Sequence, residues 1–218
     1  KAAAEAAAAG IFFNQGEVCS ATSRLFVHED IQADFTALLL DAAQAYAPGN
    51  PLDLASGMGA MVSEEQTGRV LSYIETGKAE ADLLCGGSRV LAETGGSFIA
   101  PTIFTHVDPR AVIATEEIFG PVLSVISFRN EADVVGLANA SIYGLGASIW
   151  TRDLDRAVRM SRALHVGSVS VNAVDHVDLR TPFGGVKQSG NGRDLSLHAF
   201  EKYLDLKTTW ISIRETAA

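Results

Sequence analysis

The stretch Phe12-Phe13-Asn14-Gln15-Gly16-Glu17-Val18-Cys19-Ser20-Ala21 separates an alanine-rich segment from the first apolar, strand-like run of the chain. Its thiol, Cys19, follows a polar turn that contains a glycine, and a run of small residues comes after it. Backbone N–H groups at a turn can face a sulfur and favour its thiolate, whereas a structural cysteine normally lies inside an apolar strand or helix. Taken alone, the stretch also fits an ordinary small core residue beside a turn.

The segments around this turn predict alternating helices and strands. Apolar periodicity predicts helices over residues 1–9 (closed by Gly10), 30–47, 63–77 (closed by Gly77), 130–139 and 154–164. Ser63 and Gln66 are expected to form a capping box for the third of these helices, and Asn130 is expected to cap the fourth. Runs of β-branched and aromatic residues predict strands over 24–28, 82–85, 98–107, 122–128, 145–150 and 166–171. This order favours an α/β fold with a mostly parallel, twisted sheet and helices on both faces. Ligand sites lie at the carboxyl ends of such strands, so loop 172–193 is expected to line a pocket.

The C-terminal segment 203–213 alternates apolar and polar residues, which is typical of a half-exposed strand. It follows the predicted sheet rather than continuing its alternation with helices. A lone strand needs an edge to pair with, so we expect it to associate with another domain or another subunit.

Composition excludes several classes of protein. With 218 residues, of which 47% are apolar and 20% charged, the chain can form a globular domain with one sizeable core. A net charge of -9 argues against nucleic acid or an anionic membrane as partner, and no apolar run approaches the length of a membrane span. Two cysteines are too few for a disulfide framework and favour a reduced, cytoplasmic setting. No histidine spacing indicates a metal site, and a solvated loop explains Asp175-His176-Val177-Asp178 better than metal ligands do.

Three motifs together resemble the aldehyde dehydrogenase superfamily. They are the cysteine motif 14–19, Glu116-Glu117-Ile118-Phe119-Gly120-Pro121-Val122, and Pro182-Phe183-Gly184-Gly185-Val186-Lys187-Gln188-Ser189-Gly190, in the family's order. The resemblance implies a cysteine-bearing catalytic domain over residues 1–188, and a return segment with an oligomerisation strand over 189–218. The chain starts without Met in what looks like the middle of a helix, so we interpret it as the C-terminal half, with the coenzyme-binding domain upstream.

The resemblance also implies roles for individual residues. Cys19 would attack an aldehyde, its backbone N–H would help to hold the oxyanion, and the adduct would pass a hydride to NAD or NADP. The coenzyme side would be formed by Glu117, Phe119, Gln66 and Arg69. The substrate side would be formed by Val18, Ser20, Asp175, Val177 and Phe183, with no metal. The family's general-base glutamate and oxyanion asparagine lie upstream of the cysteine motif, and we do not assign Glu17 as the base. Relatives of this kind associate, so a homo-oligomer (dimer or tetramer) is expected.

Other stretches, such as 143–154 and 189–194, resemble the branch of the family that oxidises γ-glutamyl-γ-aminobutyraldehyde. This resemblance suggests an aminoaldehyde substrate. Asp175 and Asp178 could attract its amino group, or they could simply solvate the loop. Two other hypotheses remain open from the residues: a cysteine-dependent esterase or thioesterase, which needs a histidine near Cys19, and a catalytically silent association domain that acts through its tail.

Overall fold

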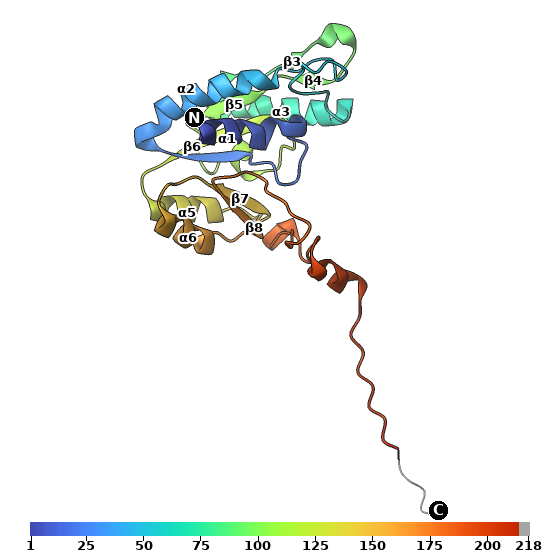
Figure 1. The fold of residues 1–218 in the computed structure, drawn as a ribbon. Helices are drawn as coiled ribbons and strands as arrows, with labels where there is room; N and C mark the ends of the chain where they lie inside the picture. Colours follow the sequence, from blue (N-terminus) through green and yellow to red (C-terminus); the bar gives the residue numbers. More distant parts are fainter. Residues whose placement is uncertain (214–218) are drawn as a thin grey trace, which may run out of the picture.

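A four-stranded sheet organises the first part of the chain, whose residues 1–213 are described by a computed structural model (Figure 1). The strand order is β1 (Arg24–His28), β6 (Val122–Phe128), β5 (Thr102–Thr105) and β2 (Asp82–Cys85). β1 and β5 both run parallel to β6, and β2 pairs with β5 in the antiparallel sense. The expected α/β class with a mostly parallel sheet is therefore confirmed.

Helices cover both faces of this sheet because its central strands are apolar on both sides. On one face, Ile103 and Leu123 pack with α1 (Ala2–Phe12) and α2 (Gln32–Ala43). On the other face, Phe104 and Val122 pack with α3 (Glu64–Glu80) and α4 (Val112–Thr115). These neighbouring residues of β5 and β6 point to opposite faces, as the two-residue period of a strand requires. None of the helices within residues 1–213 is long and apolar enough to cross a membrane.

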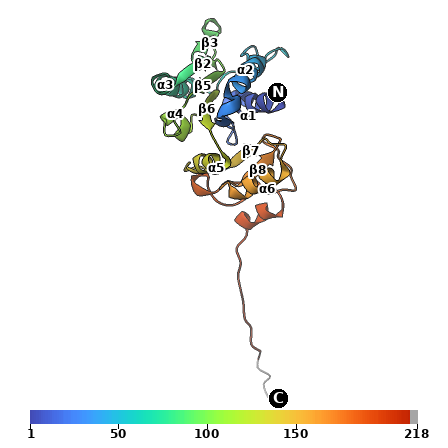
Figure 2. The same cartoon turned by 90° about the vertical axis from the view of Figure 1, so that its left-hand side faces the viewer.

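Two strands from the second part of the chain form a separate body. β7 (Gly146–Ile149) and β8 (Ser168–Val171) pair in parallel, and α6 (Leu154–Ala163) connects them. Together with α5 (Glu131–Asn139) they lie below the four-stranded sheet in Figures 1 and 2. The sequence pattern predicted these strands and helices, but it did not show that β7 and β8 form a sheet apart from the four-stranded one.

Two predicted helix ends and one predicted strand are wrong. α1 continues through Gly10, because this glycine lets the helix approach the side chain of Thr22. α3 continues past Gly77, where the ring of Phe104 occupies the space that a Cβ would fill. The predicted strand 98–107 is split at Pro101 into β4 (Phe98–Ile99), which pairs with β3 (Arg89–Val90), and β5.

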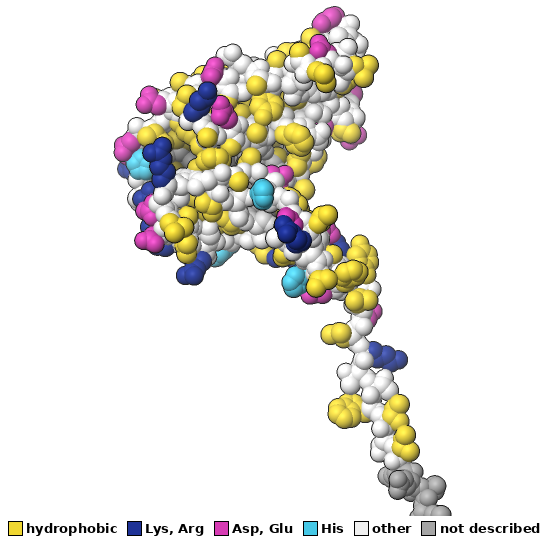
Figure 3. All heavy atoms as spheres, viewed as in Figure 1, with side chains coloured by type: hydrophobic (Ala, Val, Ile, Leu, Met, Phe, Trp, Pro, Cys, Tyr) yellow, Lys and Arg dark blue, Asp and Glu magenta, His cyan; other side chains and the backbone are white. Residues whose placement is uncertain are grey.

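The tail leaves the second body as an extended segment with exposed apolar side chains (Figure 3). After a 3₁₀ helix at Leu197–Tyr203, residues 204–213 form no strand, and Trp210 is 93% exposed. An extended segment without a partner edge has no sheet hydrogen bonds to make. The predicted association of this tail stays a prediction, and part of segment 189–218 lies outside the described residues.

Candidate active site

The cysteine turn begins where α1 ends. A 3₁₀ helix at Phe13–Gly16 holds three successive residues, Asn14, Gln15 and Gly16, at positive φ values of 48°, 57° and 72°. This reversal brings the chain back toward β1, and Cys19 lies exposed in the next turn. That turn is closed by a hydrogen bond of 3.0 Å from the N–H of Ala21 to the carbonyl oxygen of Val18. The prediction that Cys19 lies at a turn is confirmed.

Side chains of the motif fasten this turn to the loop that precedes α3. Gln15 Nε2 donates to the carbonyl oxygen of Ala60 at 2.8 Å. Both carboxylate oxygens of Glu17 lie within 3.2 Å of the N–H of Val62, which donates to them. Burial raises the pKa of Glu17, and the hydrogen bond from Val62 opposes this rise. The Glu17 carboxylate therefore fastens the cysteine turn to this loop.

The structure brings the four predicted coenzyme-side residues together. Gln66 Nε2 donates to the carbonyl oxygens of Ile118 (3.1 Å) and Phe119 (2.8 Å), and Arg69 Nη2 donates to that of Glu117 (3.3 Å). One face of α3 thus holds three successive carbonyl groups, while Phe119 adopts a positive φ of 55°. The Glu117 carboxylate and the Phe119 ring remain exposed. In this arrangement Gln66 and Arg69 position the turn, and direct coenzyme contact for them stays a prediction.

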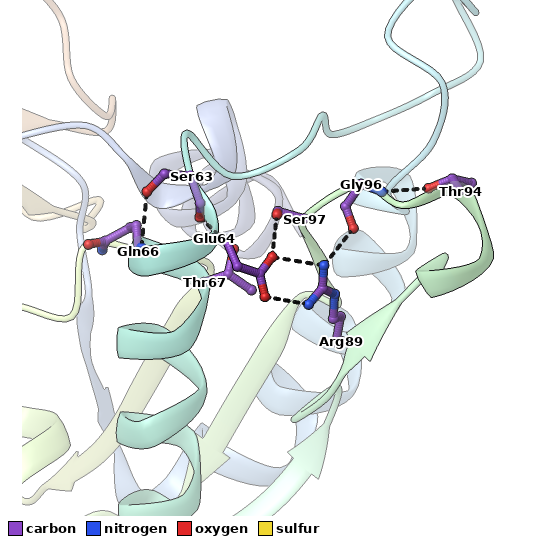
Figure 4. A network of polar contacts seen from close by, with 8 residues as sticks. All are labelled: Ser63, Glu64, Gln66, Thr67, Arg89, Thr94, Gly96 and Ser97. Atoms are coloured by element: carbon purple, nitrogen blue, oxygen red, sulfur yellow. Dashed lines mark hydrogen bonds and ion pairs between the residues drawn. The ribbon is translucent and has the colours of Figure 1, made fainter.

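The start of α3 is itself held rigidly, as Figure 4 shows. The hydroxyl of Ser63 accepts from the N–H of Gln66, which is the predicted N-cap. The Gln66 side chain does not complete the capping box, because it reaches residues 118 and 119 instead. Glu64 accepts two hydrogen bonds from Arg89 and one from Ser97, and the bonds from Arg89 lower the pKa of this carboxyl.

The cysteine turn and the Glu117–Phe119 turn touch through their backbones. Gly16 lies directly against Gly120, with no room for a Cβ between them. Gly120 in turn lies against the side chain of Val70 on α3. The predicted nucleophile and the predicted coenzyme side therefore belong to one continuous, packed unit.

The predicted substrate-side residues line two adjoining cavities, whose walls include both sequence neighbours of Cys19 but not Cys19 itself. The larger, of about 270 Å³, is lined by Ala9, Gly10, Phe13, Val18, Ser20, Ala21, Tyr46, Val174 and Asp175. The smaller, of about 30 Å³, is lined by Ser20, Thr22, Gly146, Ala147, Ser148, Ser168, Ser170, Asp175, His176, Val177 and Phe183. Ser20 and Asp175 line both cavities, so the two bodies of the chain meet here. All five predicted residues line at least one of them.

The two acidic residues of the pocket loop differ in their surroundings. Asp178 accepts hydrogen bonds from the N–H and the side chain of Arg180, which lower the pKa of Asp178 to about 2. Asp175 is exposed at a positive φ of 45° and takes no such bond from the described residues. Of these two carboxylates, Asp175 is the one available to a ligand.

Sequence reasoning missed several lining residues. Phe13, Tyr46 and Val174 line the larger cavity, and His176 lines the smaller one. Phe13 and Val174 are immediate neighbours of predicted motif or pocket residues, so their positions gave a usable signal. Tyr46 gave none, because it reaches the cavity from a 3₁₀ helix that follows α2.

The comparison with known families agrees with this geometry. The model of the aldehyde dehydrogenase family matches residues 1–209. The chain belongs to the aldehyde dehydrogenase family. The family match includes all three motifs as well as both walls of the cavities, and the predicted membership is confirmed.

Several individual relatives share about half of their aligned residues with this chain. The chain is 52% identical over 211 residues to the NADP/NAD-dependent aldehyde dehydrogenase PuuC of Escherichia coli, a match that covers 97% of this chain. A solved γ-glutamyl-γ-aminobutyraldehyde dehydrogenase from Burkholderia cenocepacia is 55% identical over 95% of this chain, with a TM-score of 0.93. The indole-3-acetaldehyde dehydrogenase AldA of P. syringae, solved with NAD+ and IAA, is 51% identical over 97% of this chain, with a TM-score of 0.94. The chain spans about 42% of the length of the curated relative PuuC.

Proposed function

We propose that this chain supplies the cysteine-bearing part of an NAD(P)-dependent aldehyde dehydrogenase, in which Cys19 is the nucleophile. The observation that carries the proposal is the exposed thiol between Val18 and Ser20, which line cavities shared by two bodies. The same packed unit holds a free carboxylate and an exposed ring at Glu117 and Phe119.

The Glu117–Phe119 turn fits the nicotinamide end of the coenzyme. A carboxylate accepts hydrogen bonds from ribose hydroxyls, and an aromatic ring packs against a planar heterocycle. Both groups are exposed while Gln66 and Arg69 hold the backbone between them. When bound, NAD(P)+ accepts the hydride that leaves the substrate carbon.

The chain's own residues then account for the covalent steps. The sulfur of Cys19 attacks the carbonyl carbon, an S–C bond forms, and the backbone N–H of Cys19 holds the negative oxygen. Loss of hydride from that carbon leaves a thioester, because the oxygen regains its double bond. Water then breaks the S–C bond, which releases the carboxylic acid and the free thiol. We assign the activation of this water to the part of the relatives' length that this sequence does not cover.

We propose an aminoaldehyde of the γ-glutamyl-γ-aminobutyraldehyde type as substrate. Asp175 supports this proposal, since it places an unpaired carboxylate on both cavities. An esterase or thioesterase would need a histidine to activate the thiol. His176 lines the smaller cavity, but no hydrogen bond joins it to Cys19 among the described residues.

The test compares the intact chain with its Cys19→Ala and Cys85→Ala variants. Cys85 is the control, since it is a half-buried thiol of β2 whose Sγ lies 3.6 Å from the carbonyl oxygen of Pro101. We expect an aldehyde to protect Cys19 from iodoacetamide and to leave Cys85 unprotected, with any NADH formation lost only in Cys19→Ala. If Cys19 is unprotected by any aldehyde and its removal changes no activity, the proposal is wrong.

A further inference from the structure

The carboxyl end of α5 receives two cations from two separate segments of the chain. Arg24 Nη1 and Nη2 donate to the carbonyl oxygens of Leu137 (3.4 Å) and Ala138 (3.2 Å). Lys187 Nζ donates to those of Asn139 (3.0 Å) and Ser141 (3.1 Å). The last carbonyls of a helix lack intrahelical donors and carry partial negative charge, so cations stabilise this end.

The guanidinium of Arg24 has its hydrogen-bond acceptors at this helix end. Its guanidinium is partly buried, and this burial lowers the pKa of Arg24. The Cζ atom of Arg24 lies 5.4 Å from the centroid of the Phe26 ring. No carboxylate of the described residues forms an ion pair with Arg24. A buried charge is costly unless hydrogen-bonded partners compensate it, so the α5 carbonyls stabilise Arg24 in place.

Each cation belongs to a different wall of the cavities. Arg24 is the first residue of β1 and follows the cysteine turn directly. Lys187 follows the Phe183 segment, at a positive φ of 56°. The neighbours of Lys187 are fixed to the loop after α5 as well, since Val186 N donates to the carbonyl oxygen of Gly144 at 2.9 Å. One helix end thus holds both the Cys19 wall and the Phe183 wall.

We infer that Arg24 and Lys187 are positioning residues that set the separation of the two walls around the aldehyde. This inference rests on the proposed function, because the separation acts on catalysis only if the cavity takes the substrate. Neither residue lines the cavities or touches Cys19. Small displacements of a bound reactant from its attacking group are enough to weaken reaction strongly, which makes an anchor shared by both walls effective at a distance.

The first experiment measures how propionaldehyde protects Cys19 of the intact chain from iodoacetamide. The reversible adduct forms an S–C bond while the carbonyl oxygen takes the thiol proton, so no oxidant is needed. In Arg24→Met and Lys187→Met we expect the half-protecting concentration to rise about fivefold, equivalent to about 1 kcal/mol of binding free energy. Arg24→Lys and Lys187→Arg keep a cation and should restore protection. Alkylation of the half-buried Cys85 in the same molecules is the control for the fold. Its rate should not change, because only a loosened fold would raise it.

The second experiment measures hydrogen exchange by mass spectrometry and needs no substrate. Lys187→Met should speed exchange of residues 183–190, and Arg24→Met that of residues 18–24, with 137–142 affected in both. Unchanged exchange in both Met variants, or unchanged half-protecting concentrations, overturns the inference. If the native chain is not protected by aldehyde while exchange responds as expected, the proposed function fails and the anchoring of both walls by α5 stands.

Discussion

A Cβ added to Gly16 would stand 2.2 Å from the carbonyl oxygen of Gly120, and the φ of Gly16 is +72°. Contact and conformation both require glycine at this position, because an L side chain avoids the left-handed region and no atom fits in the gap. The contact joins the turn that bears Cys19 to the turn that bears Glu117 and Phe119. Their relative position is therefore set by backbone packing rather than by flexible side chains.

Gly16→Ala should destabilise the chain more than a left-handed alanine alone does. Gly95 provides the matched control, since its φ is +73° and no atom lies within 4 Å of its Cβ position. We expect Gly95→Ala to lower the free energy of unfolding by about 1 kcal/mol, and Gly16→Ala to lower it by more than about 2 kcal/mol. Urea denaturation monitored by circular dichroism measures both. Equal losses would show that the Gly16–Gly120 contact adds nothing.

Gln66→Leu should loosen the Glu117–Phe119 turn. The substitution removes the donor from the partly buried carbonyl group of Ile118 and from the exposed one of Phe119, which costs about 1–2 kcal/mol. Exchange of the backbone amides around Phe119 should become faster in the same variant. The control is Glu65→Leu, an apolar substitution at the exposed neighbouring position, for which we expect a change below about 0.5 kcal/mol. A Gln66→Leu variant as stable as this control contradicts the positioning role.

Glu17 should make stability depend on pH with a defined sign. Burial raises the pKa of Glu17 above its ordinary value of 4.5, so the folded chain binds more protons at this site than the unfolded chain. The free energy of unfolding therefore falls as the pH rises from 4.5 through the raised value. Glu17→Gln removes this titration and keeps an oxygen that can accept from Val62. Its stability relative to the native chain should rise across that range, and a constant difference would exclude the effect.

Asp175 and Asp178 should differ in their effect on a cationic substrate. Arg180 holds the pKa of Asp178 at about 2 and occupies its carboxylate, whereas Asp175 lines both cavities. Asp175→Asn should weaken the protection of Cys19 by 4-aminobutyraldehyde about threefold, as expected for an exposed ion pair. Protection of Cys19 by propionaldehyde should stay the same in this variant. Asp178→Asn should leave the protection by both aldehydes unchanged. Equal weakening by both substitutions would assign the effect to the loop rather than to Asp175.

Local signals in the sequence predicted most of the elements of this fold. Ser63 and Asn130 cap their helices as predicted, and β1, β2 and β6 have their predicted bounds. The errors at Gly10 and Gly77 share one cause. Both glycines were interpreted as helix stops, but each permits a close approach by a distant side chain, which single-sequence patterns do not reveal.

The residue types of the candidate site were predictable from motifs, but their connections were not. Cys19 and Phe183 were identified from short stretches, and the structure places their neighbours around shared cavities. The bonds from Gln66 to residues 118 and 119, and the contact of Gly16 with Gly120, join parts far apart in the chain. Such contacts follow from packing of the whole domain, so no local sequence pattern predicts them.

The passage from β6 to α5, between Phe128 and Glu131, is the covalent link between the two bodies within residues 1–213. Beside it, Glu29 and Arg129 form an ion pair of 3.1 Å. A rotation about this link would change the width of the cavities without breaking any strand pairing, since β6 and β7 belong to different sheets. Exchange of a few surface side chains at this junction would therefore alter the width of the cavities, while the apolar clusters on the two faces of the four-stranded sheet stay unchanged.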